Sequence, residues 1–478
     1  MVAPDAPWTF TLSSRSGRLA FSMKTRRTIS VARATAGVAA LAVLAIAARA
    51  EAQDAGTTPT CDSFTNPVYI SGSSASQPVL QALANTLGTG ISIIYQNPDS
   101  CLGVNDFLMN MASTESGVAT SYLNPTSGKA TTCTITPATD TVDIAVSDVF
   151  AATCTLYNPS VTALTASQVE IEGPIQAMTI AVPATSQGST SISAEAANIV
   201  FGGDAQTAAV TVQQWNQPTA IFTRANTSGT LNMIGTAIGL VPSMWANAAP
   251  ATPAPANQKS STGNMFNGIA GATANISQTI GILSDEAVVQ KNAAALAATP
   301  AGPTVKPLFF QGTGQTCGYL PDSTTTTFDK VNVREGRYDI WGPIHFITAV
   351  GANGQPNGVH AAAVATVLNY FIATGATPDA PLFTAGADAG TVDVAKKALI
   401  TAEATPLVGG VVPWCAMHVM RTSEVGPEAS YQPPEPCGCY FESVTGSTLE
   451  SYCKACPTGT ECAGTSYPVC RYGYCEVQ

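Results

Sequence analysis

A repeated order of apolar segment, polar loop and amphipathic segment is the feature that most limits the fold of this chain. Residues 68–70 are apolar, the serine- and glycine-rich loop 71–76 follows, and residues 78–87 then place apolar side chains at helical spacing. Two further apolar segments, 91–96 and 142–148, are also followed by polar loops. Because such strand–loop–helix units assemble into parallel sheets covered by helices, the sequence predicts an α/β fold.

The composition excludes several classes of protein. Only 11% of the 478 residues are charged and 45% are hydrophobic, unlike a highly charged disordered chain. The formal net charge is -11, so we expect no nucleic-acid binding through a basic surface. Thirteen cysteines beside three histidines are typical of an exported, disulfide-bonded protein rather than of a cytosolic metalloenzyme. We therefore expect neither a metal site nor a cofactor.

The N-terminal region has the pattern of a secretory signal peptide. Its apolar run, residues 37–48, is shorter than the ~20 residues of a membrane span and follows several basic residues. A small-residue pattern predicts cleavage after Ala52, and the pair Arg26–Arg27 leaves open general secretory or twin-arginine export. No later segment is apolar enough to span a bilayer. We expect a mature chain without a transmembrane segment, located in the periplasm, secreted or at the cell surface.

Residues 224–230, RANTSGT, are the strongest candidate for a binding segment. They follow an apolar strand and precede an amphipathic segment, so Ser228, Gly229 and Thr230 are expected at the N-terminus of a helix. Free backbone N–H groups and the positive end of the helix dipole attract anions there. Arg224 adds a planar guanidinium suited to a tetrahedral oxyanion. Taken alone, the segment is more typical of a capped helix beside a surface arginine.

Three other loops carry polar groups at comparable positions. The loop 71–76 offers a glycine and several hydroxyls before a helix, Ser100 precedes the next helix, and Asp148 follows an apolar strand. Ligands of open α/β sheets bind at the carboxyl ends of strands, where these loops lie. Each loop also has a simpler explanation, because serine-rich turns are frequent and a carboxylate in this position often caps a helix or forms a hinge salt bridge.

Together these segments resemble the periplasmic phosphate-binding proteins of ABC importers, which belong to the type II periplasmic-binding-protein class. Four segments match in order: VYISGSSASQPVLQAL, IYQNPDSCLGVNDF, VDIAVSD and RANTSGT, the last at every fixed position of the family's Arg-x-x-x-Ser-Gly-Thr motif. The resemblance extends over about three quarters of the chain. Small residues replace an aromatic residue in the first loop, which leaves the choice between Ser73, Ser74 and Ser76 open. In the second loop, residues 101–103 replace the usual Ser-Gly-Gly run.

The resemblance implies two α/β lobes joined by crossover strands, with the ligand in the cleft between the lobes. With the breaks in composition, it divides the chain into a signal peptide 1–52 (1–22 being an over-long start), lobe one 61–149, lobe two 150–336, the return of lobe one 337–421, and a cysteine-rich tail 422–478. We expect the body to fold without this tail. The phosphate-binding residues that the resemblance implies are Ser73, Ser74, Ser100, Asp148, Arg224, Ser228, Gly229 and Thr230.

The implied function is capture of inorganic phosphate for import by an ABC transporter, without catalysis. Asp148 would accept the proton that phosphate retains at neutral pH, whereas sulfate has no such proton and would be repelled. The alternative is a secreted or surface-attached binding or structural protein of the same fold, with altered anion specificity or none, because the tail is foreign to the family. A secreted hydrolase is a third class, but the sequence lacks a nucleophile elbow and the usual metal motifs.

The cysteines divide into six in the body and seven in the tail. For the body we expect three disulfides, and the pairs that we consider are Cys133–Cys154, Cys61–Cys101 and Cys317–Cys415. The tail contains a Cys-x-x-Cys pair at residues 453–456, but no second such pair and no histidine accompany it. We therefore expect disulfides rather than zinc in the tail, and one cysteine that is free or linked to another molecule.

Overall fold

The computed structural model describes residues 58–112, 119–157, 161–202, 212–246, 256–373, 392–424 and 426–477, all within the unit that begins at Thr57. The predicted signal peptide lies outside the described residues. Among the helices that are described, none is both long and apolar enough to cross a membrane.

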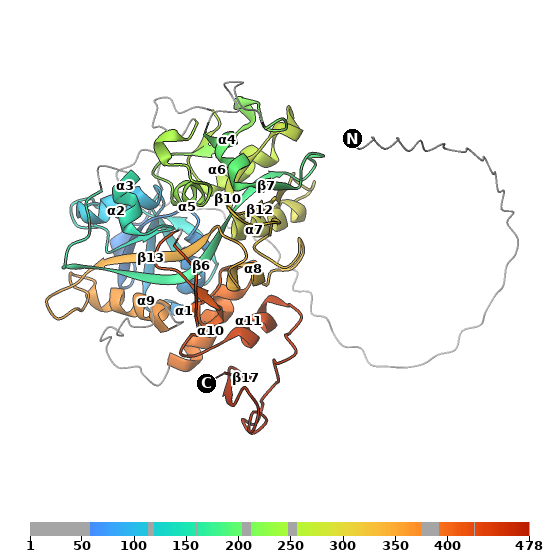
Figure 1. Ribbon diagram of the computed structural model, residues 1–478. Coiled ribbons are helices and arrows are strands. Elements are labelled where there is room, and N and C mark those ends of the chain that lie inside the picture. Colours follow the sequence, from blue (N-terminus) through green and yellow to red (C-terminus); the bar gives the residue numbers. More distant parts are fainter. Residues whose placement is uncertain are drawn as a thin grey trace, which may run out of the picture. The chain divides into compact units, whose positions relative to one another are not determined.

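A mixed sheet forms the centre of the fold, in the order β10-β6-β13-β5-β1-β2-β3-β4 with β11 added beside β6 (Figure 1). Its strands are β1 Pro67–Gly72, β2 Ser92–Gln96, β3 Ser121–Asn124, β4 Lys129–Thr132, β5 Ile144–Ser147, β6 Gln168–Pro183, β10 Gly281–Ser284, β11 Val305–Pro307 and β13 Trp341–Ala349. Strand pairs outside this sheet are β7 Ser191–Ser193 with β12 Phe309–Gln311, β8 Thr223–Arg224 with β9 Gln258–Lys259, β14 Val419–Met420 with β15 Ala429–Ser430, and β16 Val469–Arg471 with β17 Tyr474–Glu476.

Helices lie in the connections between these strands. They are α1 Gln77–Leu87, α2 Ser100–Leu108, α3 Ala151–Tyr157, α4 Ala194–Phe201, α5 Gly229–Ile238, α6 Thr262–Ala270, α7 Asp285–Ala297, α8 Val331–Arg334, α9 Ala361–Ala373, α10 Val392–Ala404 and α11 Gly438–Thr445. The alternation of strands and helices confirms the predicted α/β fold.

Strand β6 connects the two halves of the sheet. Its first part pairs antiparallel with β13, and its last part pairs antiparallel with β10 and β11. A buried apolar core continues through both halves, where Tyr338 donates a hydrogen bond to the Met178 carbonyl oxygen at 2.6 Å. The single long strand is a crossover of the kind that the family resemblance implies.

In the first half of the sheet, the helices α1 and α2 begin after the parallel strands β1 and β2. Strand β1 pairs in parallel with both β2 and β5. Helix α2 crosses the end of β1 so closely that a Cβ on Gly103 would lie 2.3 Å from the Cα of Gly72. Only glycine fits at this crossing. As a result, the start of α2 lies at the carboxyl end of β1, where the sequence predicts a ligand loop.

The second half contains the helix that the RANTSGT segment predicts. Helix α5 follows β8 directly, with Ser228 as its N-cap residue, and ends at Gly239 in the left-handed conformation (φ 69°). It packs against β6, β10 and α4, while α6 and α7 cover other parts of β6 and β10. The predicted helix start at residues 228–230 is therefore observed.

Six disulfides confirm the predicted oxidised state, but the pairing that we considered for the body is wrong. The bonds join Cys61–Cys133, Cys101–Cys154, Cys415–Cys437, Cys439–Cys453, Cys456–Cys470 and Cys462–Cys475, and Cys317 is exposed without a disulfide. The sulfurs of three tail cysteines lie within 4.8 Å of one another, yet all three are disulfide-bonded.

The pairing follows from the fold rather than from nearness in the sequence. A bridge between Thr60 and Thr134 brings Cys61 to Cys133, and the packing of α2 on α3 brings Cys101 to Cys154. The disulfide between Cys415 and Cys437 ties the tail to the body.

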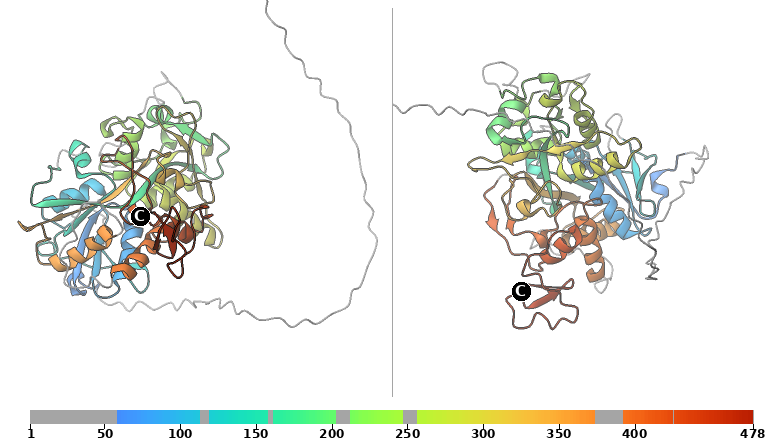
Figure 2. Two further views of the ribbon diagram at one scale, coloured as in Figure 1. Left: turned by 60° about the horizontal axis from the view of Figure 1, so that its bottom comes forward. Right: turned by 90° about the vertical axis from the view of Figure 1, so that its right-hand side faces the viewer.

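Residues directly after Arg421 make many contacts with the body. The Glu424 carboxylate accepts a hydrogen bond from Thr153 Oγ1 at 2.5 Å, and Arg421 pairs with Glu428 at 2.7 Å. Arg334 pairs with Glu442 of α11 at 3.1 Å. In Figure 1 and in the right-hand view of Figure 2, the segment with β17 projects beyond α10 and α11. We propose that residues 422–445 belong to the main fold and that the separate module begins after α11.

Candidate anion-binding site

Asp148 lies where several separate loops meet. It follows β5 and is buried, with 2% of its surface exposed. Its backbone N–H donates to Ser100 Oγ at 3.2 Å, and Thr230 Oγ1 donates to its Oδ2 at 3.5 Å. A Cβ on Gly229 would lie 2.3 Å from Ser100 Oγ and 2.9 Å from Asp148 Oδ2. The predicted residues from β5, α2 and α5 are therefore close together.

The first serine loop divides its hydroxyls between two directions. Ser73 hydrogen-bonds the carboxylate of Asp148, and Ser76 Oγ donates to Asp148 Oδ1 at 3.5 Å. Ser74 turns away, and its Oγ lies 3.1 Å from the hydroxyl of Thr262 at the start of α6. Of the three serines between which the sequence left the choice open, Ser73 and Ser76 face the carboxylate, and Ser74 instead connects α1 with α6.

The guanidinium of Arg224 is buried and already has an anionic partner. It forms an ion pair with Asp99, whose other carboxylate oxygen accepts a hydrogen bond from Thr227 Oγ1 at 3.1 Å. The same nitrogen of Arg224 donates to the Ser260 carbonyl oxygen at 3.3 Å. Its Nε has no partner in the part of the chain that the structure describes. Asp99 thus holds Arg224 at the position where the resemblance implies an anion.

Sequence reasoning did not single out Asp99, although it directly precedes Ser100. The available signal was a carboxylate inside a loop that the resemblance assigns to an anion. Ser228, by contrast, was predicted and is buried at the start of α5, where its side chain makes no capping hydrogen bond. Its backbone N–H donates to the Ala225 carbonyl oxygen at 3.0 Å.

Burial sets the protonation of the carboxyl groups in this region. It raises the pKa of Asp148, an effect opposed by hydrogen bonds from Ser73 and Ser100 and by Arg224. Burial likewise raises the pKa of Asp99 to about 6, against the opposing effect of Arg224. It raises the pKa of Glu286, at the start of α7, to about 8, with smaller contributions from Asp285 and Asp148. Of these three groups, Glu286 therefore holds its proton at neutral pH.

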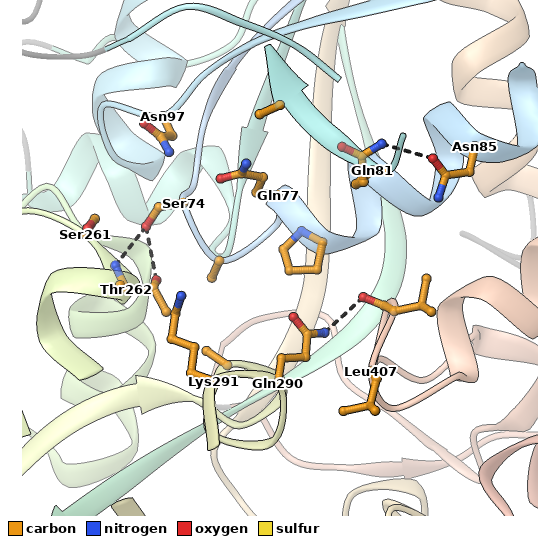
Figure 3. Close-up of a pocket in the computed structure, with 17 residues that line it drawn as sticks. Ser74, Gln77, Gln81, Asn85, Asn97, Ser261, Thr262, Gln290, Lys291 and Leu407 are labelled. Atoms are coloured by element: carbon orange, nitrogen blue, oxygen red, sulfur yellow. Dashed lines mark hydrogen bonds between the residues drawn. The ribbon is translucent and has the colours of Figure 1, made fainter. Parts of the chain in front are cut away.

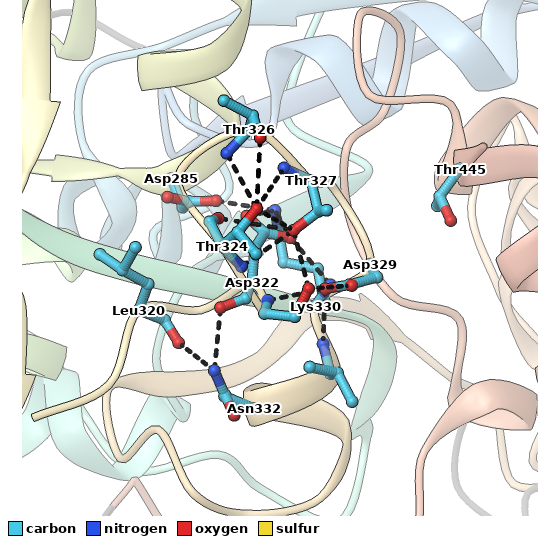
Figure 4. A network of polar contacts seen from close by, with 12 residues as sticks. Asp285, Leu320, Asp322, Thr324, Thr326, Thr327, Asp329, Lys330, Asn332 and Thr445 are labelled. Atoms are coloured by element: carbon cyan, nitrogen blue, oxygen red, sulfur yellow. Dashed lines mark hydrogen bonds and ion pairs between the residues drawn. The ribbon is translucent and has the colours of Figure 1, made fainter. Parts of the chain in front are cut away.

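Two further buried groups border these carboxyl groups. Gln176 Nε2 donates to Glu286 Oε1 at 2.6 Å. Asp285 instead forms an ion pair with Lys330 at 2.8 Å, and Lys330 also pairs with Asp322 at 2.8 Å (Figure 4). Because Lys330 is saturated by two carboxylates, it stabilises the loop around α8 and is not available to an external anion.

The site is closed around Asp148. The Cys101 N–H donates to the Thr227 carbonyl oxygen at 3.0 Å, which joins the start of α2 to the segment before α5. Gly229 is in direct contact with Ser100 and Asp148. The starts of α2 and α5 are therefore in contact at Asp148, and Asp99 occupies the guanidinium of Arg224.

No protein-family model and no curated protein matches the chain. Similar solved structures include the ancestral soluble variant of the human phosphate-binding protein (13% identity, TM-score 0.41, 73% of this chain and 90% of that chain). Also similar is a DING protein, at 14% identity and a TM-score of 0.40, over 72% of this chain and 90% of that chain. An ABC-type phosphate transport receptor from Vibrio cholerae is similar at 14% identity and a TM-score of 0.34, over 60% of this chain and 88% of that chain.

Proposed function

We propose that the mature chain is an exported binding protein that captures inorganic phosphate where α2 and α5 meet. The observation that carries this proposal is the convergence on Asp148 of hydroxyls from three separate loops, Ser73, Ser100 and Thr230, beside the start of α5. These are donors of the kind that a tetrahedral oxyanion requires, and Arg224 adds a guanidinium that acts on Asp148.

Each group has a defined part in this proposal. On opening, the N–H groups in the first turn of α5 and the hydroxyls of Ser100 and Thr230 donate to phosphate oxygens. Arg224 supplies the positive charge, and Asp148 accepts the proton that phosphate keeps near neutral pH. Closure then excludes water, which strengthens each charged hydrogen bond. Delivery of the bound anion to an ABC importer, by a periplasmic or surface-located chain without catalysis, completes the proposed role.

Asp99 favours a second candidate function. Because its carboxylate already neutralises Arg224, an incoming anion must displace an internal one. A chain whose internal pair holds the site shut would be a secreted or surface-attached binding or structural protein with altered anion specificity or none. Both candidates share the fold, and they differ in whether phosphate competes successfully with Asp99.

Isothermal titration calorimetry of residues 53–478 with phosphate, arsenate and sulfate distinguishes the two candidates. The phosphate-binding proposal predicts saturable binding of phosphate and arsenate, which both retain a proton, and much weaker binding of sulfate. Absence of saturable binding of phosphate by a folded chain, across pH 5 to 8, would leave only the second candidate. Equal affinity for sulfate and phosphate would contradict the role of Asp148 as a proton acceptor.

A further inference from the structure

A pocket with a volume of about 560 Å³ lies between α1, α6 and α7, apart from Asp148 (Figure 3). This volume is within the range of about 300–1,000 Å³ that is typical of small-molecule sites. The hydrogen bond between Ser74 and Thr262 forms part of its wall, and both residues line it. None of the groups that surround Asp148 at hydrogen-bond distance lines this pocket, so it is distinct from the closed site.

The lining of the pocket carries one positive charge and no negative charge. Its only charged residue is Lys291 of α7, although the whole chain has a net charge of -11. The ammonium group lies 3.6 Å from the place where a Cβ on Gly263 would be, beside the first turn of α6. Burial lowers the pKa of Lys291, and no neighbouring carboxylate opposes this effect within the described part of the chain. Lys291 is therefore a partly desolvated cation without a counter-ion.

Side-chain amides form much of the remaining wall. Figure 3 shows Gln77 and Asn97 facing the same space as Lys291, and neither side-chain amide has a hydrogen-bond partner among the described residues. Gln81 donates to Asn85 Oδ1 at 3.0 Å, while Gln290 donates to the Val408 carbonyl oxygen at 2.9 Å. These amides offer both donors and acceptors, which is the combination that hydroxyl groups require.

We propose that this pocket binds a phosphorylated polyol, such as a sugar monophosphate, with the phosphate on Lys291 and the hydroxyls on the amides. A neutral sugar would leave the ammonium group without a counter-ion, and a free phosphate ion would leave the amides of Gln77 and Asn97 unused. The proposal goes beyond phosphate capture at Asp148, because it concerns a different space and a different cation.

Calorimetry with glucose 6-phosphate tests the proposal directly, with glucose and inorganic phosphate as comparison ligands. The variant Lys291→Gln should weaken glucose 6-phosphate binding about tenfold or more, since it removes a charge-assisted hydrogen bond. Lys454→Gln, which removes a lysine that does not line the pocket, should change nothing. Affinity for inorganic phosphate at the Asp148 site should be the same in both variants.

Three results would overturn the proposal. These are no binding of glucose 6-phosphate to the wild type, unchanged binding in Lys291→Gln, or equally tight binding of glucose. None of them depends on whether inorganic phosphate binds at Asp148, so the two proposals can fail separately. A second variant, Gln77→Ala, should also weaken glucose 6-phosphate, and thermal melting confirms that each variant is folded.

Discussion

The ion pair between Asp99 and Arg224 leads to a specific prediction about affinity. Replacing Asp99 by Asn removes the internal negative charge but keeps an oxygen that accepts a hydrogen bond from the guanidinium or from Thr227. Phosphate then no longer competes with a buried carboxylate for Arg224. We therefore expect Asp99→Asn to bind phosphate more tightly than the wild type.

The size of the effect follows from the charge of Asp99. A hydrogen bond to a charged group contributes about 1.5–3 kcal/mol, so the gain should be about 10- to 150-fold where Asp99 is ionised. Because burial raises the pKa of Asp99 to about 6, the wild-type carboxyl group is largely neutral at pH 5 and ionised at pH 8. The advantage of Asp99→Asn should therefore be large at pH 8 and small at pH 5.

Calorimetric titrations of both proteins between pH 5 and 8 measure this ratio of affinities. The protonation of phosphate itself also changes in this interval, but it cancels when the two proteins are compared at the same pH. Asp62→Asn, at an exposed carboxylate outside the site, is the matched control and should behave as the wild type. A ratio that does not vary with pH, or weaker binding by folded Asp99→Asn, would refute the competition between Asp99 and phosphate.

Three other perturbations have defined outcomes. Asp148→Asn should narrow the preference for phosphate over sulfate. If competition titrations show the same ratio of phosphate to sulfate affinity in wild type and variant, Asp148 is not a ligand residue. Glu286→Gln should flatten the pH dependence of the free energy of unfolding. The pKa of Glu286 is about 8 in the folded chain, above the ordinary 4.5, so its protonated form stabilises the fold fully below pH 4.5, and roughly 4 kcal/mol of this stability is lost as the pH rises through 8. Urea unfolding of both proteins at pH 5 and 9 measures this difference. Truncation after Arg421 should abolish cooperative melting by circular dichroism because the contacts of Glu424 and Glu428 are lost, whereas truncation after Gly446 with Cys439→Ser should preserve it.

Local sequence signals were sufficient for the parts of the site that depend on one segment. The strand–loop–helix order around Ser100 and the RANTSGT segment predicted the starts of α2 and α5, because the change from a polar loop to apolar periodicity is visible within a few residues. The gathering of these loops near Asp148 was implied by the family resemblance, and it agrees with the general rule that ligand loops lie at the carboxyl ends of strands.

Contacts between distant segments could not be predicted in the same way. The partner of Cys101 depends on the packing of α2 against α3, and the partner of Cys415 lies beyond the composition break that suggested a separate tail. The position of Asp99 beside Ser100 was visible in the sequence, but its partner was not, since the ion pair depends on a guanidinium 125 residues away. Ser74 was predicted as a ligand residue through the family resemblance of its loop, but the neighbouring start of α6 provides its hydroxyl with another partner.

Titration of phosphate into the wild type and into the double variant Asp99→Asn/Arg224→Ala tests the central claim most directly. The double variant leaves no unpaired carboxylate where the ion pair was, so loss of binding reports the missing guanidinium rather than a buried charge. We predict saturable binding to the wild type and a loss of about a hundredfold or more in the double variant, because a desolvated charged contact contributes about 2–5 kcal/mol. Equal affinity of the two folded proteins for phosphate would contradict the claim that the anion is held beside Arg224.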